Sequence, residues 1–315
     1  MQRFILRRFL SGLLSLLAAT MIVFGLSRAA GDPLLLFADP TGYGITEEQK
    51  EALAKNLGLD KPLVAQYFIW LGNTLSGDLG KTLRDRRPVG RVIWERVPAT
   101  LQLGLGAMIF AVVVGIPLGV LSAVKRGSVL DYTGRTFALL GQALPVFWIA
   151  ILAILLFSVQ MDLLPSGTRP TYIGLPGQLR YYIMPAIVLG WFPAASFVRL
   201  TRSAMLEVLD SEFVKFARAK GVAPGHVVWK HAFRNALLQP LTLWALLAAG
   251  LITGSVIVET VFSWPGIGRL VVQAVWDNDF PILMPAVLLF TAVFVLMNLL
   301  ADIAYAFADP RIRYS

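Results

Sequence analysis

The chain has 315 residues, of which 57% are hydrophobic and only 15% are charged, and its mean hydropathy is +0.68. Soluble domains carry about 25% charged residues, so this composition excludes an ordinary soluble domain and indicates a membrane protein. The chain has no cysteine and only two histidines, which excludes a disulfide framework and leaves no histidine or cysteine cluster to hold a metal.

Six stretches of 18 or more residues lack any charge, at residues 9–27, 97–124, 136–161, 181–198, 235–258 and 280–301. Because about 20 apolar residues cross a bilayer core as an α-helix, we predict an all-α membrane protein with six transmembrane helices. The first stretch follows Arg3, Arg7 and Arg8, as in a secretory signal peptide. Its 19 residues exceed the roughly 7–15 of a signal-peptide core, so we expect a retained anchor. In the second stretch, Gly115 and Gly119 predict close packing on a neighbouring helix.

Positive charges are unevenly divided between the segments that join the predicted spans. With the N-terminus placed in the cytoplasm, the inner segments hold 15 Lys and Arg residues against 5 acids, whereas the outer segments hold 13 of each. An excess of Lys and Arg on the cytoplasmic side is typical of membrane proteins. We therefore expect both termini to be cytoplasmic, and the net charge of +9 then requires no nucleic-acid partner.

The predicted spans divide the chain into a cytoplasmic tail with the first span at 1–28, an external subdomain at 29–96, a five-span core at 97–308 and a cytoplasmic tail at 309–315. We expect the external part to be a small helical subdomain. Thr46 followed by Glu47 and Glu48 resembles a helix N-cap, and residues 62–77 read as an amphipathic surface segment. The core includes a long cytoplasmic loop at 199–234.

The segment SGDLGKT at 76–82 ends like a phosphate-binding loop. The full pattern G-x-x-x-x-G-K-[ST] requires glycine at position 75, which is Leu75 here, and no strand precedes the segment. The charge pattern also places it outside the membrane, away from cytoplasmic ATP. The sequence shows no other catalytic motif, so we expect no ATPase site, no other enzyme activity and no cofactor in this chain.

Polar side chains are sparse in the predicted spans, where they mark candidates for function. Candidates for a substrate path are Gln102, Gln142, Asn298, Trp148 and Pro145, which permits a helix break. Asp302 lies near the inner end of the last span, where we expect it to pair with a nearby arginine; a proton relay is the alternative. Structural or gating candidates in the segment ETVFSWPGIG are Glu259, Trp264, Pro265, Gly266 and Gly268.

An apolar stripe at helical spacing runs through the cytoplasmic loop. Its members are Leu206, Leu209, Phe213, Phe216 and Ala217, and Lys215, Arg218 and Lys220 flank it. Gly221 and Pro224 should end this helix. The stripe alone fits a helix lying on anionic lipid as well as a helix docked on another protein.

Motifs along nearly the whole chain resemble those of one family. They are LGLDKPLVAQYFIWL, GDLGKT and RVPATLQL in the first third, LPVFW and LLPSG around the third span, RLTRSAMLEVLDSEFVKFARAKG and KHAFRNALLQP in the cytoplasmic loop, and VIVETVFSWPGIGRL and ADPRIRY near the end. The chain resembles the membrane permease subunit of ATP-binding-cassette (ABC) importers of the oligopeptide, dipeptide and nickel type. The resemblance implies the type I ABC importer permease fold in the cytoplasmic (inner) membrane of a bacterium or archaeon.

The resemblance also assigns a role to the cytoplasmic loop. Its counterpart in the family, the E-A-A-x-x-x-G element, is a short helix docked in a groove of the ATPase subunit. Here Lys215 stands at the glutamate position, and Glu212, one turn earlier, is a candidate for the same contact. The implied docking helix comprises Glu212, Phe213, Lys215, Phe216, Ala217, Arg218, Ala219, Lys220 and Gly221.

The function implied by the resemblance is ATP-driven import by alternating access, with this chain forming half of the path for di- or oligopeptides. Its implied partners are a second homologous permease, two ATPase subunits that bind ATP and Mg²⁺, an external substrate-binding protein and membrane lipid. Alternative cargoes within the class are glutathione, nickel complexes, opines and sugars. A channel, a proton-coupled carrier and a membrane enzyme are the alternative classes.

Overall fold

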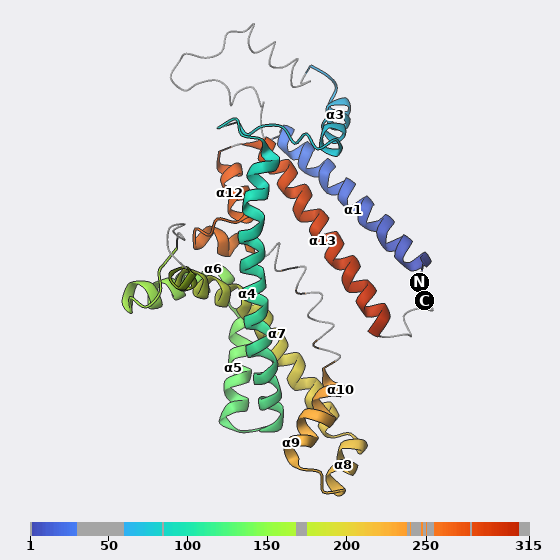
Figure 1. Ribbon diagram of the computed structural model, residues 1–315, viewed down its shortest axis with the longest axis vertical. Coiled ribbons are helices and arrows are strands. Elements are labelled where there is room, and N and C mark those ends of the chain that lie inside the picture. Colours follow the sequence, from blue (N-terminus) through green and yellow to red (C-terminus); the bar gives the residue numbers. More distant parts are fainter. Residues whose placement is uncertain are drawn as a thin grey trace.

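The computed structural model describes residues 2–29, 60–83, 85–167, 175–237, 255–277 and 279–308, together with residues 240, 247 and 250. Across these ranges the regular secondary structure is helical, and an isolated antiparallel bridge joins Lys81 and Pro88. The helices form an elongated bundle in which α4 and α7 run lengthwise and α1 and α13 lie side by side (Figure 1). The short helices α8, α9 and α10 lie at one end, and α3 and α12 lie toward the other.

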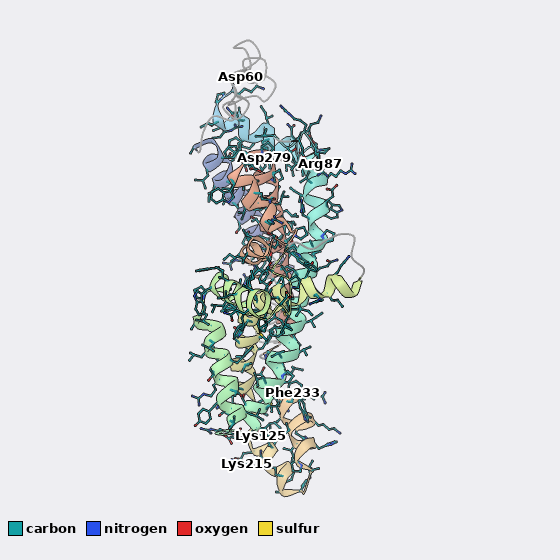
Figure 2. All side chains as sticks on the ribbon, turned by 90° about the vertical axis from the view of Figure 1, so that its left-hand side faces the viewer. Asp60, Arg87, Lys125, Lys215, Phe233 and Asp279 are labelled. Atoms are coloured by element: carbon teal, nitrogen blue, oxygen red, sulfur yellow. The ribbon has the colours of Figure 1, made fainter. Side chains whose placement is uncertain are left out.

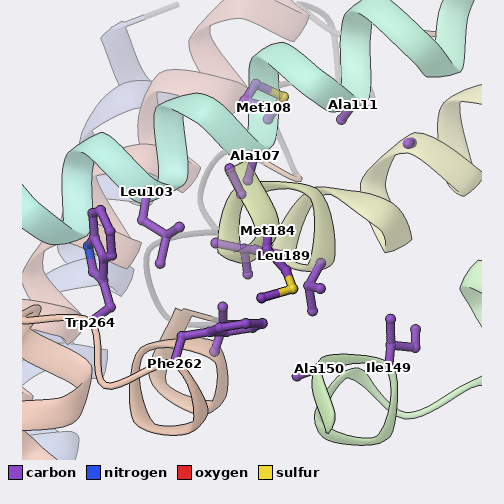
Figure 3. Close-up of a cluster of buried hydrophobic side chains, with 14 of the residues drawn as sticks. Leu103, Ala107, Met108, Ala111, Ile149, Ala150, Met184, Leu189, Phe262 and Trp264 are labelled. Carbon is purple, nitrogen blue, oxygen red and sulfur yellow. The ribbon is translucent and has the colours of Figure 1, made fainter. Parts of the chain in front are cut away.

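The centre of the bundle is the pair α4 (Val89–Val124) and α7 (Leu175–Leu209). Figure 3 shows Leu103 and Ala107 of α4 close to Met184 and Leu189 of α7, and all four belong to the main buried cluster. Such close packing of small and branched apolar side chains is how helices associate in a membrane, where burial from water supplies no driving force.

Gly115 and Gly119 bring the backbones of α4 and α7 close together, as their spacing predicts. A Cβ added at Gly115 would lie 2.7 Å from the carbonyl oxygen of Ala194, and one at Gly119 would lie 2.8 Å from Cβ of Thr201. Neither position therefore has room for a side chain, and the two glycines act in packing within the chain.

A second pair consists of α1 (Gln2–Ala29) and α13 (Phe280–Ala308), which run antiparallel (Figure 1). The amphipathic segment predicted at 62–77 contains α3 (Leu63–Leu75), which rests on the end of α1. There the hydroxyls of Thr20 and Tyr67 are 2.8 Å apart, and the ring of Tyr67 meets that of Phe24 edge-on at 5.5 Å.

The third predicted span is broken in the middle. The helices α5 (Val129–Ala143) and α6 (Val146–Ala153), the latter continuing as the π-helical segment η2 (Ile154–Gln160), meet at an angle of 113°. Leu144 has extended backbone at the break, since the ring of Pro145 disfavours helical dihedrals in the preceding residue. The break falls at Pro145, the residue that permits one in the sequence, and the apolar run at 136–161 is divided between two helices.

Four helices of the described part are long and apolar enough to cross a membrane, and the bent pair gives a fifth if it counts as one span. The four are Leu6–Ala29, Val89–Val124, Gly177–Leu209 and Phe280–Leu300. The span predicted at 235–258 lies largely outside the described residues, so a total of six stays a prediction. The N-cap predicted at Thr46 and the tail at 309–315 lie outside them as well.

The remaining elements are short. They are α8 (Glu212–Ala219), α9 (Pro224–His226), the π-helical η3 (Val227–Phe233) and α10 (Arg234–Ala236) in the predicted cytoplasmic loop, and α12 (Ile267–Trp276) before the last span. The domain boundaries expected from the sequence stay predictions; α4 itself starts at Val89, within the region assigned to the external subdomain.

Candidate functional site

Helix α8 occupies the segment where the sequence predicts a docking helix. Ser211 stands at its N-cap position and Glu212 supplies an acid to its first turn. Gly221 ends it with φ of +78°, a conformation in which glycine has no steric penalty, and Val222 N–H donates to the carbonyl oxygen of Ala217 at 3.3 Å. The sequence rule for the end of this helix therefore holds in the structure.

The apolar residues of α8 lie on two faces of the helix, whereas the sequence predicts a single apolar stripe. Val214 and Ala217 are buried against α7, η3 and α10, whereas Phe213 is 47% and Phe216 is 61% exposed. The expectation that Phe213, Phe216 and Ala217 share one apolar face was wrong, because the return of the chain through η3 covers one side of α8. Two phenyl rings are left exposed on the other side.

Charged groups surround the exposed rings. Nζ of Lys215 donates to Oε1 of Glu212 at 2.8 Å, and this hydrogen bond raises the pKa of Lys215. The ammonium of Lys220 lies 4.5 Å from the ring centroid of Phe216. The charge of Lys215, which stands where the general family pattern has glutamate, is thus paired with Glu212 on the same helix.

The gating candidates form a compact cluster at the other end of the core. Glu259 is fully buried, and its Oε1 accepts hydrogen bonds of 2.8 Å from the hydroxyls of Thr100 and Ser255. Its Oε2 accepts the backbone N–H of Arg269 at 3.0 Å, and the Thr100 hydroxyl accepts the backbone N–H of Ile267 at 2.8 Å. Glu259 and Thr100 together cap the N-terminal turn of α12, which otherwise has unpaired N–H groups.

The other members of the segment fit around this carboxylate. Trp264 is buried, its Nε1 donates to the carbonyl oxygen of Ala99 at 2.9 Å, and its side chain stands beside Leu103 (Figure 3). A Cβ at Gly266 would collide with the carboxylate of Glu259, and one at Gly268 would lie 2.6 Å from Cα of Val256. Pro265, between Trp264 and Gly266, is half-buried.

The sequence missed the partners that hold Glu259 in place. Thr100 is 159 residues away in the chain, and Ser255 precedes Glu259 by one helical turn. The available signal was chemical: a carboxylate inside an apolar segment needs hydrogen-bond donors when it is buried. Nothing in the spacing singles out Thr100 as one of them.

Three of the path candidates lie at the break between α5 and α6. Gln142 is in the last turn of α5, and its amide Nε2 is buried with no hydrogen-bond partner among the described residues. Pro145 is the N-cap of α6, and Trp148 on α6 is 44% exposed. Buried polar groups normally have a partner, so this amide makes Gln142 a candidate for a contact that forms in another state of the path. The break places this amide and the exposed ring of Trp148 on the two helices that meet there.

The other path candidates lie on other helices. The backbone carbonyl of Gln102 on α4 accepts the Tyr182 hydroxyl at 2.5 Å. Asn298 lies on α13 and donates to the carbonyl oxygen of Phe294 on its own helix at 3.0 Å. The side chain of Asp302 lies outside the described residues, so its expected pairing with an arginine stays a prediction.

The segment that resembles a phosphate-binding loop is a tight turn. Asp78 Oδ1 accepts the N–H of Gly80 at 3.0 Å, and Asp279 Oδ2 accepts the N–H of Leu83 at 3.0 Å. The Thr82 hydroxyl donates to Asp85, which lowers the pKa of that carboxyl. Thr82 is 2% exposed, and its hydroxyl also accepts the N–H of Arg87 at 3.1 Å, so this hydroxyl is engaged within the turn.

The turn and the docking segment lie at opposite ends of the molecule. Figure 2 shows Arg87 and Asp279 at one end and Lys125, Lys215 and Phe233 at the other. The core between them contains the buried cluster around Glu259 and the break at Pro145. This arrangement separates a predicted external surface from a predicted cytoplasmic one by the length of the helices.

Comparison with known proteins identifies the family. Residues 115–314 match the model of the binding-protein-dependent transport system inner membrane component, and residues 1–104 match that of its N-terminal part. The chain is 39% identical to the dipeptide transport system permease protein DppB of Escherichia coli K12 over 339 residues, covering 100% of this chain and 99% of DppB. It is also 39% identical to the oligopeptide transport system permease protein AppB of Bacillus subtilis over 320 residues, covering both chains fully.

The fold is similar to that of a chain in the inward-facing structure of the MetNI methionine ABC transporter. The TM-score is 0.56 at 21% identity, and the match covers 70% of this chain and 98% of the other. This likeness shows the type I ABC importer permease fold. The chain therefore belongs to the family of binding-protein-dependent ABC importer permeases, as its motifs predict.

Proposed function

We propose that this chain is the membrane-spanning subunit of an ATP-driven importer and forms half of the path for di- or oligopeptides. The observation that carries this is similarity over the full length to a dipeptide and an oligopeptide permease. The buried core, the break at Pro145 and the exposed face of α8 supply parts that such a subunit needs. Glutathione, nickel complexes, opines and sugars are other cargoes of the same class.

The exposed face of α8 supports docking on an ATPase subunit. Phe213 and Phe216 supply apolar surface for a groove, and Arg218 and Lys220 supply positive charge for acidic walls. Because Val214 and Ala217 fix the helix to the rest of the chain, a displacement of α8 is passed on to α7. ATP and Mg²⁺ belong to two partner ATPase subunits, and a second homologous permease completes the path.

The chain would lie in the cytoplasmic membrane with both termini inside. The distribution of Lys and Arg supports this orientation. The antiparallel course of α1 and α13 is consistent with it, since α1 starts and α13 ends at the same end of the pair (Figure 1). The turn at residues 77–88 would then face an external substrate-binding protein.

Transport would proceed by alternating access. ATP closes the ATPase pair and the docked α8 helices move with it, so that the path opens outward; hydrolysis returns it inward. A ligand shifts such an equilibrium only by its different affinity for the two states. A path with few polar groups, such as Gln142, is compatible with this mechanism, because a substrate bound tightly in one state of the path would be released slowly.

Reconstitution in liposomes with the partner permease, the ATPases and the binding protein tests the proposal. We expect uptake of labelled dipeptides that requires both ATP and the binding protein. Flux through this chain alone without ATP would indicate a channel. Loss of transport in Asp302→Asn, with the ATPase rate unchanged, would indicate a proton-coupled carrier.

A further inference from the structure

Asp131, in the first turn of α5, is a buried carboxylate with no part in the function described so far. It is 2% exposed, and Arg202 of α7 donates from Nε to its Oδ1 at 2.7 Å and from Nη2 to its Oδ2 at 3.0 Å. The N–H of Gly127 also donates to Oδ2 at 3.0 Å. A two-point pair of this kind fixes both distance and orientation, so it fastens the start of α5 to α7.

Further along, α5 is held on α7 by apolar contacts. Ala138 packs in one buried cluster with Ala195 and Val198. Phe137 stacks on Trp191 with ring centroids 5.5 Å apart, and Nε1 of Trp191 donates to the carbonyl oxygen of Phe137 at 3.3 Å. The two helices are thus joined from the first turn of α5 to near its last.

Each end of this two-helix unit leads to a part of the proposed site. At one end α7 passes through Asp210 and Ser211 into α8, whose Val214 packs in the same cluster as Met205 of α7. At the other end α5 finishes at the break before Pro145, beside the amide of Gln142. A movement of α8 is carried along α5 to the break if α5 follows α7, and α6 beyond the break also packs on α7, with Ile149 and Leu189 in one buried cluster.

We propose that Asp131 and Arg202 are positioning residues that make α5 and α7 one rigid lever, which carries the displacement of the docking helix α8 to the break at Pro145. The proposal rests on the proposed function. It follows from the cost of separating the pair: the side chain of Asp131 is 2% exposed, so without Arg202 its charge is left buried and poorly compensated, whereas Arg202 is 21% exposed. With the pair intact, pivoting of α5 against α7 is resisted at the end nearest α8.

The test uses the reconstituted complex with Asp131→Asn and measures peptide uptake and ATP hydrolysis together. We expect ATP hydrolysis within about twofold of wild type and a fall of about tenfold in uptake per ATP hydrolysed. The matched control is Thr133→Val on the same helix, which removes an exposed hydroxyl that donates to the carbonyl oxygen of Leu130 within α5 at 3.1 Å. That variant should keep the wild-type ratio, and an unchanged ratio in Asp131→Asn would overturn the lever.

An engineered disulfide tests whether the Asp131–Arg202 pair transmits movement or only stabilises the fold. The chain has no native cysteine, so Ala138→Cys with Ala195→Cys introduces the two thiols needed to join α5 to α7. Oxidation of this pair should leave transport by the otherwise wild-type complex unchanged and should restore the uptake-to-ATP ratio of Asp131→Asn. Oxidised protein that transports normally but does not restore that ratio would contradict the proposal.

The outcomes distinguish the lever from the proposed function. If the wild-type complex does not import peptides with ATP, the proposed function fails. If the wild-type complex imports peptides but Asp131→Asn does not assemble, the disulfide variant of the otherwise wild-type chain tests the lever on its own. Transport that continues after oxidation supports one rigid unit, and transport that stops and returns on reduction shows that α5 must move against α7.

Discussion

The hydroxyl of Thr100 and the carboxylate of Glu259 meet at 2.8 Å, although 159 residues separate them in the chain. Both side chains are buried to within 1% of full burial. Thr100 donates to Glu259 and accepts the N–H of Ile267, so one hydroxyl ties α4 to the segment before α12 and to the first turn of α12. The gating candidates are therefore held to the central helix pair by a polar contact inside an apolar core.

Replacement of Thr100 by valine, which has nearly the same shape, should lower the free energy of unfolding. It removes one donor to Glu259 and leaves the N–H of Ile267 buried without an acceptor, which costs about 1–3 kcal/mol. The unfolding midpoint of the purified complex in detergent measures the change.

The control for Thr100→Val is Thr260→Val. The Thr260 hydroxyl is exposed and donates to the carbonyl oxygen of Val256 on its own helix at 2.7 Å. We expect its loss to change stability by less than about 0.5 kcal/mol. Equal shifts of the unfolding midpoint in the two variants would show that the buried hydroxyl contributes no more to stability than the exposed one.

Alanine substitutions of two glycines in α4 should have opposite effects. At Gly115 the new Cβ meets the carbonyl oxygen of Ala194 at 2.7 Å, so α4 and α7 must separate or bend. At Gly104 nothing lies within 4 Å, so alanine should be neutral or stabilising by up to about 1 kcal/mol through its helix propensity. Thermal unfolding of both variants compares the two sites, and a stable Gly115→Ala would contradict the close approach.

The two faces of α8 predict two different defects. Val214 is fully buried in the cluster that includes Val227, so Val214→Ala should destabilise the chain by about 1–3 kcal/mol. Phe216 is 61% exposed, so Phe216→Ala should leave unfolding unchanged and weaken retention of the ATPase during purification. Retention of the ATPase at the wild-type level in Phe216→Ala, at any detergent concentration tried, would argue against docking through this face.

Local patterns in the sequence predict the parts of the fold that depend on neighbouring residues. Charge-free runs locate the long apolar helices, and Gly221 marks the end of α8 as predicted. Contacts between distant segments escape such patterns. The pairing of Thr100 with Glu259 spans half the chain, and the burial of Val214 instead of Phe213 depends on where η3 returns.

The break at Pro145 shows a limit of hydropathy as a signal. The residues on both sides are apolar, so the run from 136 to 161 reads as one span, while the helix direction changes by 113°. The proline was visible in the sequence as a site of helix breakage, but the angle depends on how α5 packs on α7. Candidate path residues could be named from polarity, whereas the structure shows that Gln142 ends one helix and Trp148 lies in the first turn of the next.

Substitution of Gly221 should uncouple ATP hydrolysis from uptake. Its φ of +78° lies in the left-handed region, and a Cβ added there would meet nothing within 4 Å, so the cost to another residue is backbone strain alone. A β-branched residue such as valine is strained most there, by about 1–3 kcal/mol, and relieves the strain by unwinding the end of α8. We expect the Gly221→Val chain to retain less of the ATPase, or the complex to hydrolyse ATP with reduced uptake. Reversal of the charges of Arg218 and Lys220 should have the same effect.

The matched control for Gly221 is Gly225, in α9. A Cβ there also meets nothing within 4 Å, and its φ is outside the left-handed region, so Gly225→Ala should be tolerated. The measurement is uptake per ATP hydrolysed in liposomes, together with co-purification of the ATPase. Because both glycines lie in the same predicted cytoplasmic loop, a defect confined to Gly221 would trace to the end of α8, whereas normal uptake and normal ATPase retention in Gly221→Val would refute coupling through this helix.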